Sequence, residues 1–483
     1  MSKIDRRTAM QLGTAALAAR QVAAAQPGLN IAFPQAGRLK PRSAVSISAS
    51  PLSVGFETLD RKMFEPEKTY GALAQLGAKW ARCQTGWART EQRKGEYDFR
   101  WLDGVVDSLL KIGVQPWFNL GYGNRLYSPE AAHETAVGYI PTTAEARKAW
   151  VAYVGRLAEH FRGRVKHWEI WNEPNIKNFW RPNDPDPRAY AEFVAMTAPV
   201  IRKRIPGVTI VGFALAGFGS AIDYVKGALE SGIARHIDKF SYHPYQLIPE
   251  ANYADHVRAY RRLLARYKPG IQLWQGENGA PSQIGGAGHV FEVDGTETGQ
   301  AKWLLRRILT DLSLDVELSS YFHLTDLANY IWSDGQSGQT QRMGLLRAGE
   351  YTPKVSYTAY QSLCALFDTR SKRVDAPAIF NRIQPDAPKR VVASDGIWRA
   401  AFLRENRPIC AYWRADDLSQ PARSEEANLS LWPEVEMPAP VLVDPLTAQV
   451  YELKATRRGG WYDIRRLPVF GYPLIITDRS VVA

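Results

Sequence analysis

The chain has 483 residues, of which 45% are hydrophobic and 23% charged, and a formal net charge of +12. This composition excludes a disordered chain, and the length exceeds what one barrel usually needs, so we expect a globular protein with a second domain. The basic residues are scattered and form no recognition motif, which argues against nucleic-acid binding.

Residues 1–25 predict an export signal. Arg6 and Arg7 precede a small, apolar stretch at residues 13–19, and the alanines at 23–25 are of the kind that a signal peptidase accepts. This order is typical of a twin-arginine signal peptide, so we expect export of a folded protein to the periplasm or beyond. Without this segment the net charge falls to about +9. No other apolar run reaches the roughly 18 residues of a membrane-spanning helix, so no membrane insertion is expected.

Residues 51–368 alternate short β-rich runs with amphipathic helical stretches. Residues 26–50, which precede them, are predicted to be a linker or a strand that packs on the C-terminal domain. Eight strand and helix pairs predict a closed (β/α)8 TIM barrel. The predicted strands are 52–56, 79–83, 114–120, 165–171, 209–213, 239–243, 272–276 and 319–324. The predicted helices are 67–75, 102–112, 144–161, 187–204, 221–231, 253–267, 300–312 and 353–367.

Residues 369–483 lose the helical pattern and continue in short runs of alternating polarity. This change predicts an appended C-terminal antiparallel β-sandwich domain. Its predicted strands include 397–403, 408–413, 428–431, 450–453 and 474–477.

Two of the predicted barrel strands end on a carboxylate. The run at residues 165–175 leads through apolar and aromatic residues to Asn172 and Glu173, and the run at 271–279 leads to Glu277. Because the carboxyl ends of barrel strands open at one mouth, both glutamates are expected to face the same cleft. Most glycosidases cleave the glycosidic bond with two carboxyl groups that face each other across it, so this pair predicts such an enzyme.

The motifs at these strand ends carry a family resemblance. With Asn172-Glu173-Pro174, Gly276-Glu277, Arg82 on the second strand and a Tyr/His-rich run at 241–245, residues 50–370 resemble the retaining glycoside hydrolases of clan A. The segment is most similar to glycoside hydrolase family 39, and family 5 shares much of the same signature. The resemblance implies a hydrolase of O-glycosyl bonds that acts on a polysaccharide or oligosaccharide.

Carried onto this chain, the resemblance makes Glu173 the general acid/base and Glu277 the nucleophile of a double displacement. It also makes Arg82 the cation that pairs with the nucleophile. A retaining mechanism agrees with this assignment, because it needs one protonated and one ionised carboxyl group about 5 to 5.5 Å apart.

Five further residues are predicted to bind the substrate. Asn172 matches the family residue that hydrogen-bonds the sugar 2-hydroxyl, and His243 and Tyr245 match the pair beside the nucleophile on the sixth strand. Aromatic faces are natural platforms for sugar rings, so Trp180, in the loop after the acid, and Trp274 are also predicted to contact the substrate.

Neither the cysteines nor the histidines predict a metal or redox site. Cys83, Cys364 and Cys410 are far apart and match neither a CxxC motif nor a zinc cluster, and the eight histidines form no HExxH motif. We therefore expect no metal and no cofactor. One disulfide remains possible in an oxidising compartment.

Two alternatives to a general glycosidase remain open. The barrel could bind carbohydrate without cleaving it, or it could be a hydrolase or lyase specialised for acidic sugars, with an additional Arg or Lys in its pocket. The eighth strand reads Tyr321-Phe322-His323 where clan members commonly place a tryptophan, so the sugar stays open. The linkage, internal or terminal cleavage, and the oligomeric state are not determined by the sequence.

Overall fold

The computed structural model describes residues 31–285, 291–332, 335–336, 338–383, 391–393, 396–420 and 424–482. The predicted signal peptide at residues 1–25 lies outside these ranges. Over the described ranges, no helix has both the length and the apolar character needed to cross a bilayer.

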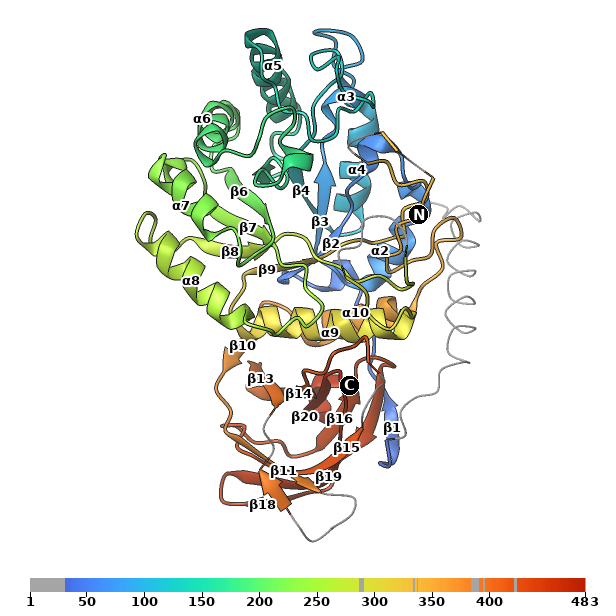
Figure 1. Cartoon of the computed structure of the whole chain (residues 1–483). Helices are drawn as coiled ribbons and strands as arrows, with labels where there is room; N and C mark the ends of the chain where they lie inside the picture. Colours follow the sequence, from blue (N-terminus) through green and yellow to red (C-terminus); the bar gives the residue numbers. More distant parts are fainter. Residues whose placement is uncertain are drawn as a thin grey trace.

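Eight parallel strands close into a barrel in the order of the sequence, which confirms the predicted TIM barrel (Figure 1). Each strand pairs with the next, and the last pairs with the first. The strands are almost entirely buried because helices cover the barrel, and they are accordingly rich in apolar residues. They are β2 (Leu52–Gly55), β3 (Trp80–Gln84), β4 (Gln115–Leu120), β5 (His167–Ile170), β6 (Thr209–Ala216), β7 (Lys239–His243), β8 (Gln272–Gln275) and β9 (Leu318–Tyr321).

The helices that follow these strands surround the barrel. They are α2 (Tyr70–Leu76), α3 (Trp87–Thr90), α4 (Arg100–Lys111), α5 (Ala144–His160), α6 (Pro187–Arg204), α7 (Ile222–Glu230), α8 (Tyr253–Ala265), α9 (Glu297–Ser313) and α10 (Val355–Leu366). Most of α9 is buried, because α9 and α10 lie between the barrel strands and the C-terminal sheets (Figure 1). A last short helix, α11 (Arg479–Val482), ends the described chain.

Two antiparallel sheets follow the barrel. One has the order β1-β17-β16-β20-β14-β13-β10 and the other the order β12-β11-β15-β19-β18. The sheets face each other, since the ring centroids of Phe380 and Tyr412 are 5.4 Å apart across them. The strands are β1 (Gln35–Arg38), β10 (Ser371–Val374), β11 (Ala378–Ile383), β12 (Val391–Ala393), β13 (Ile397–Arg404), β14 (Arg407–Arg414), β15 (Glu425–Leu431), β16 (Pro440–Asp444), β17 (Gln449–Glu452), β18 (Ala455–Arg458), β19 (Trp461–Val469) and β20 (Leu474–Asp478).

Several strands of these sheets were not predicted, and β19 shows why. Arg465 and Arg466 stand side by side in it, so the alternation of polar and apolar residues is broken. Arg466 has a φ of 56°, and the pairing with β15 shifts register between Ala427 and Leu429. A bulge of this kind changes which residues face the core, and the sequence period no longer reports the strand.

A buried ion pair joins the barrel to the sandwich. Glu250, in the loop after β7, accepts hydrogen bonds from Arg306 Nε at 2.8 Å and Nη2 at 2.6 Å, and both side chains are at most 1% exposed. Trp413 of β14 donates its Nε1–H to Glu250 Oε1 at 2.6 Å, and Arg306 Nη1 donates to the carbonyl of Asp416 at 2.6 Å. The pair therefore satisfies polar groups on both sides of the junction.

Glu250→Gln is expected to lower the free energy of unfolding by about 3 to 5 kcal/mol, because it leaves the Arg306 charge buried without a counterion. Guanidinium unfolding at neutral pH measures this loss. Glu65→Gln is the control, since Glu65 pairs with Lys68 on the surface with 59% of its side chain exposed, and a change below about 0.5 kcal/mol is expected there. Equal effects of the two substitutions would contradict the structural role of the buried pair.

Candidate active site

The carboxyl ends of four barrel strands bring together four of the predicted site residues. Arg82 lies in β3, Glu173 follows β5, His243 ends β7 and Glu277 follows β8. This is the end of the barrel at which (β/α)8 enzymes place their active sites. The side chains of Glu173 and Glu277 are 12% and 14% exposed, so both carboxylates can be reached from solvent.

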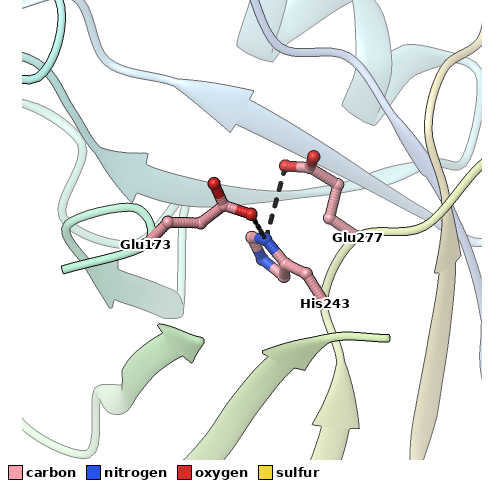
Figure 2. A group of neighbouring side chains, drawn as sticks. All are labelled: Glu173, His243 and Glu277. Carbon is pink, nitrogen blue, oxygen red and sulfur yellow. Dashed lines mark hydrogen bonds and ion pairs between the residues drawn. The ribbon is translucent and has the colours of Figure 1, made fainter. Parts of the chain in front are cut away.

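The two glutamates face each other across His243 (Figure 2). One carboxylate oxygen of Glu173, one of Glu277 and a ring nitrogen of His243 all lie within 4.8 Å of one another. His243 Nδ1 is 2.9 Å from Glu173 Oε1 and 3.9 Å from Glu277 Oε2. The spacing suits a retaining pair, because an inverting pair needs about 6.5 to 9.5 Å to admit a water molecule.

Arg82 is the cation at the centre of this site, and its side chain has no exposed surface. Its Nη1 donates to Glu277 Oε2 at 2.6 Å, as predicted, and also to Glu57 Oε1 at 3.1 Å. Its Nε and Nη2 donate to Glu169 Oε2 at 2.9 Å and 2.5 Å. The guanidinium thus fixes the carboxylate of Glu277 through a planar network of hydrogen bonds.

Sequence analysis missed Glu169 and its partner Asn119. Glu169 lies inside β5 and is fully buried, and its Oε2 also accepts from Asn119 Nδ2 at 2.8 Å. The sequence did carry a sign of Glu169, which is a charged residue between Trp168 and Ile170 in a predicted buried strand. A charge within a buried strand requires a buried counterion, so this position predicts an ion pair inside the barrel. Arg82, in the strand next but one, is that counterion.

Asn172 and Tyr245 are held by the same network. Asn172 Oδ1 accepts from Arg82 Nη2 at 2.8 Å, and Asn172 Nδ2 donates to the hydroxyl of Tyr122 at 3.1 Å. The Tyr245 hydroxyl donates to Glu277 Oε1 at 2.8 Å. Glu277 therefore has one donor on each oxygen, an arrangement that favours its charged form and fixes its orientation.

The electrostatics distinguish Glu173 from its neighbours. Burial raises the pKa of Glu173 from 4.5 to about 7, although the charge of Arg82 opposes the rise. Burial lowers the pKa of His243 from 6.5 to about 4, so its imidazole is neutral at neutral pH. A neutral imidazole can accept a hydrogen bond from protonated Glu173 at Nδ1 in one tautomer and donate one to ionised Glu173 in the other, so it suits both protonation states of Glu173.

The backbone around Glu173 adopts a conformation that sequence patterns do not predict. Four residues here have a positive φ. Trp171 and Glu173 have φ values of 71° and 48°, and Phe213 and Ala214 of β6 have φ values of 81° and 44°. A bulge in β6 between Gly212 and Leu215 turns the Ala214 carbonyl toward Glu173, whose N–H donates to it at 2.9 Å. The bulge thereby fixes the direction in which Glu173 leaves the strand.

Two predicted substrate contacts are wrong. Trp180 is 1% exposed and packs against Trp171, Tyr190 and Phe193, so it offers no face to a sugar. Trp274 is 3% exposed, and its ring packs inside the barrel against Trp117 and Trp80. Both errors have one cause, because an aromatic residue near a strand end can fill the core as readily as line a cleft.

The three atoms of Glu173, His243 and Glu277 are close enough together to contact one metal ion. This proximity follows equally from the arrangement of a hydrolytic pair with a histidine between its members, and Glu173 and His243 already hydrogen-bond each other. Cys83, Cys364 and Cys410 are buried and free. The expectation that no metal or cofactor is needed stays a prediction.

Comparison with known proteins agrees with this geometry. Residues 71–263 match the model of glycosyl hydrolases family 39. The chain is 27% identical over 136 residues to a β-xylosidase of Geobacillus stearothermophilus, a match that covers 26% of either protein. It is 24% identical over 320 residues to a β-xylosidase of Caldicellulosiruptor saccharolyticus, which covers 59% of this chain and 62% of that enzyme. These matches thus span less than two thirds of either relative.

Solved structures share the whole architecture. A family 39 glycoside hydrolase from Bacteroides cellulosilyticus WH2 superposes with a TM-score of 0.66 at 18% identity, over 89% of this chain and 81% of the other. A monomeric β-xylosidase from Caulobacter crescentus CB15 superposes with a TM-score of 0.59 at 18% identity, over 92% and 97%. At such identities the likeness concerns the fold. The family model covers the strands that carry Arg82, Glu173 and His243, and in this match and in its fold the chain is similar to the glycoside hydrolases of family 39, a retaining family of clan A.

Proposed function

We propose that this chain is a retaining glycoside hydrolase that cleaves its substrate through a covalent glycosyl-enzyme. The observation that carries the proposal is the pair of partly exposed carboxylates, Glu173 and Glu277, within 4.8 Å of each other at the barrel mouth. Their environments differ as the mechanism requires, since Glu173 holds a proton up to about pH 7 and Glu277 receives two hydrogen bonds.

In the first step, Glu277 attacks the anomeric carbon and the glycosidic bond breaks. The electron pair of that bond goes to the leaving oxygen, which takes the proton of Glu173. Arg82 and Tyr245 hold the Glu277 carboxylate in the direction of attack, so little reorganisation is needed as the new bond forms.

In the second step, ionised Glu173 takes a proton from water, and the oxygen of that water attacks the anomeric carbon. The ester bond to Glu277 breaks, its electron pair returns to the carboxylate, and the sugar leaves with its configuration retained. Glu173 is then protonated for the next cycle. His243 Nδ1, at 2.9 Å from Glu173, can hydrogen-bond either form of Glu173.

The relatives suggest the first substrates to test. Proteins named β-xylosidase match this chain in sequence, and one such protein shares its fold. Aryl β-xylosides, other aryl β-glycosides and intact polysaccharides, compared by product size, would therefore identify both the sugar and the mode of cleavage.

Glu277→Gln is expected to abolish turnover with little loss of stability, because the amide fills the same space but is a poor nucleophile. Glu173→Gln is expected to lower kcat for unactivated glycosides by about 10²- to 10⁴-fold, the usual contribution of a general acid. Exposure of the unaltered enzyme to a 2-fluoro-glycoside probe, followed by mass spectrometry, should find the adduct on Glu277.

Two outcomes would overturn this mechanism. The first is inversion at the anomeric carbon, seen by proton NMR of the first-formed product. The second is an adduct of the probe on a residue other than Glu277. Glu159→Gln, on the exposed face of α5 with 62% of its side chain exposed, is the matched control and should leave both turnover and labelling unchanged.

The activity should fall on the alkaline side as Glu173 loses its proton. Because its pKa is raised to about 7, Glu173 is protonated below that pH and ionised above it, so kcat/KM is expected to halve near pH 7 and to decline further at higher pH. In Glu173→Gln the decline near pH 7 should disappear. A decline that persists unchanged in the variant would assign the ionisation to another group.

Two alternatives are supported less well. A barrel that only binds carbohydrate does not need two carboxylates within 4.8 Å of each other, where their charges repel. A preference for acidic sugars would need a free cation near the pair. Arg61 lies against Tyr122 and Tyr330 beside the site, but it already binds Asp60, Gln84 and the Ile331 carbonyl.

We also propose that the protein is exported by the twin-arginine route, which rests on the order of residues in the segment 1–25. Arg6→Lys combined with Arg7→Lys is expected to retain the precursor in the cytoplasm, as measured by cell fractionation. Arg20→Lys, which lies outside the arginine pair, should be exported normally. Equal export of both variants would contradict the proposal.

A further inference from the structure

A third carboxylic acid lies beside the catalytic pair and has no role in the mechanism above. Glu57 follows β2, and its side chain is 2% exposed. Its Oε1 accepts a hydrogen bond from Arg82 Nη1 at 3.1 Å, and this same nitrogen donates to Glu277 Oε2 at 2.6 Å. Glu57 and the proposed nucleophile thus share a single donor nitrogen.

The position of Glu57 depends on its surroundings. A Cβ at Gly55 would lie 2.4 Å from Glu57 Oε2, so a larger residue at this position would displace the carboxyl group from the place it occupies. On the other side, His323 Nε2 is 3.6 Å from Oε2, beyond hydrogen-bond distance, and lies 3.3 Å from the backbone carbonyl of Glu57. Glu57 Oε2 is therefore buried without a hydrogen-bond partner.

An ionised Glu57 would be costly at this position. A buried carboxylate oxygen without a donor loses its hydration and gains nothing in return. The single charge of Arg82 is already shared by Glu169 and Glu277, which receive more hydrogen bonds than Glu57 does. One guanidinium cannot balance three carboxylates, so the acid with the fewest donors is the one that retains its proton.

Among the residues that the structure describes, the groups around Glu57 supply no second cation that would offset this cost. Burial keeps the pKa of His323 low, at about 3, so its imidazole is neutral, and burial holds the Cys83 thiol and the Tyr245 hydroxyl in their neutral forms. Burial raises the pKa of Glu57 itself from 4.5 to about 8; Arg82 opposes this rise and Glu277 adds to it. The charged or titratable groups that face Glu57 are Arg82, Glu277, His323, Cys83 and Tyr245.

We propose that Glu57 is a positioning residue that carries a proton in the resting enzyme, so that the positive charge of Arg82 stabilises ionised Glu277 and is not divided with a further ionised carboxylate. The proposal rests on the proposed function, since it assigns Glu277 as the nucleophile. Above the pH at which Glu57 ionises, its charge competes for Arg82 and opposes the charge on Glu277. Activity then has a second reason to fall, in addition to the ionisation of Glu173.

The test compares the unaltered enzyme with Glu57→Gln, because the amide keeps the acceptor oxygen for Arg82 but cannot ionise. At pH 7.5, infrared difference spectra should show a protonated carboxylic acid in the enzyme that the variant lacks. The kcat/KM profile of the enzyme should steepen above about pH 8, whereas the variant should show a single ionisation near pH 7. At pH 6 the kcat/KM of the variant should be lower than that of the enzyme by less than about tenfold, because the substitution alters only the hydrogen bond from Arg82 to residue 57.

Thermal unfolding gives a readout that needs no substrate. A carboxyl group whose pKa is raised binds more protons in the folded state, so its contribution to stability is fully present below about pH 4.5 and is lost as the pH rises toward 8. The Tm of Glu57→Gln relative to the enzyme should therefore rise between these pH values. Asp444→Asn is the control, since Asp444 is buried in the sandwich, where burial raises its pKa to about 6, and lies outside the site. It should leave the alkaline limb of activity unchanged.

Each failure has its own signature. If the infrared band is identical in the enzyme and in Glu57→Gln, Glu57 is ionised and the proposal is overturned, even if the 2-fluoro probe still labels Glu277. A loss of more than about 100-fold at pH 6 in a folded variant would also overturn it, because a charged Glu57 would then be required. If the probe labels nothing, the proposed function fails, and the infrared and unfolding readouts still decide the protonation of Glu57.

Discussion

The buried guanidinium of Arg82 is the interaction on which the rest of the site depends. It binds three carboxylates and Asn172, and these partners lie in or directly after three barrel strands, β2, β5 and β8. Removing its charge would leave several buried acids without a counterion, a far larger penalty than the loss of one hydrogen bond. Because Arg82 contacts residues of several strands, the orientation of the proposed nucleophile, Glu277, depends on how these strands are aligned in the barrel.

The interior below this polar network is aromatic. The rings of Trp80, Trp117 and Trp274 pack together, and the Arg82 guanidinium lies 5.5 Å from the Trp117 ring centre. Such a floor excludes water beneath Arg82, and this strengthens the electrostatic interactions of the guanidinium with the carboxylates around it. Trp274 therefore acts on the site through its packing, and a direct contact with the sugar was the wrong interpretation.

Features with a local cause were predictable from the sequence. The barrel strands follow from short β-rich runs alternating with amphipathic helices, and Glu173 and Glu277 were found because each ends such a run. What failed depends on tertiary structure. The burial of Trp180 is set by side chains from distant segments, and the bulge in β6 that directs Glu173 appears in the pairing of β6 with β7. Glu57 was missed because Phe56 and Thr58 beside it give no sign that Arg82, in the next strand of the barrel, reaches its carboxyl group.

Four glutamates lie close together at the mouth of the barrel, namely Glu57, Glu169, Glu173 and Glu277. They differ in the number of hydrogen-bond donors that each carboxyl group receives. Within the described ranges, Glu169 receives three hydrogen bonds on one oxygen, Glu277 receives one on each oxygen, and the carboxyl group of Glu173 hydrogen-bonds His243 alone. Glu57 has one donor and one bare oxygen. Since every N–H that points at a carboxylate favours its charged form, the placement of neutral and cationic donors agrees with the proposed roles, which are a structural counterion at Glu169, a nucleophile at Glu277 and proton-holding acids at Glu173 and Glu57. The identity of the residue alone does not decide its role, because the arrangement of donors is fixed by strands that are remote in the sequence.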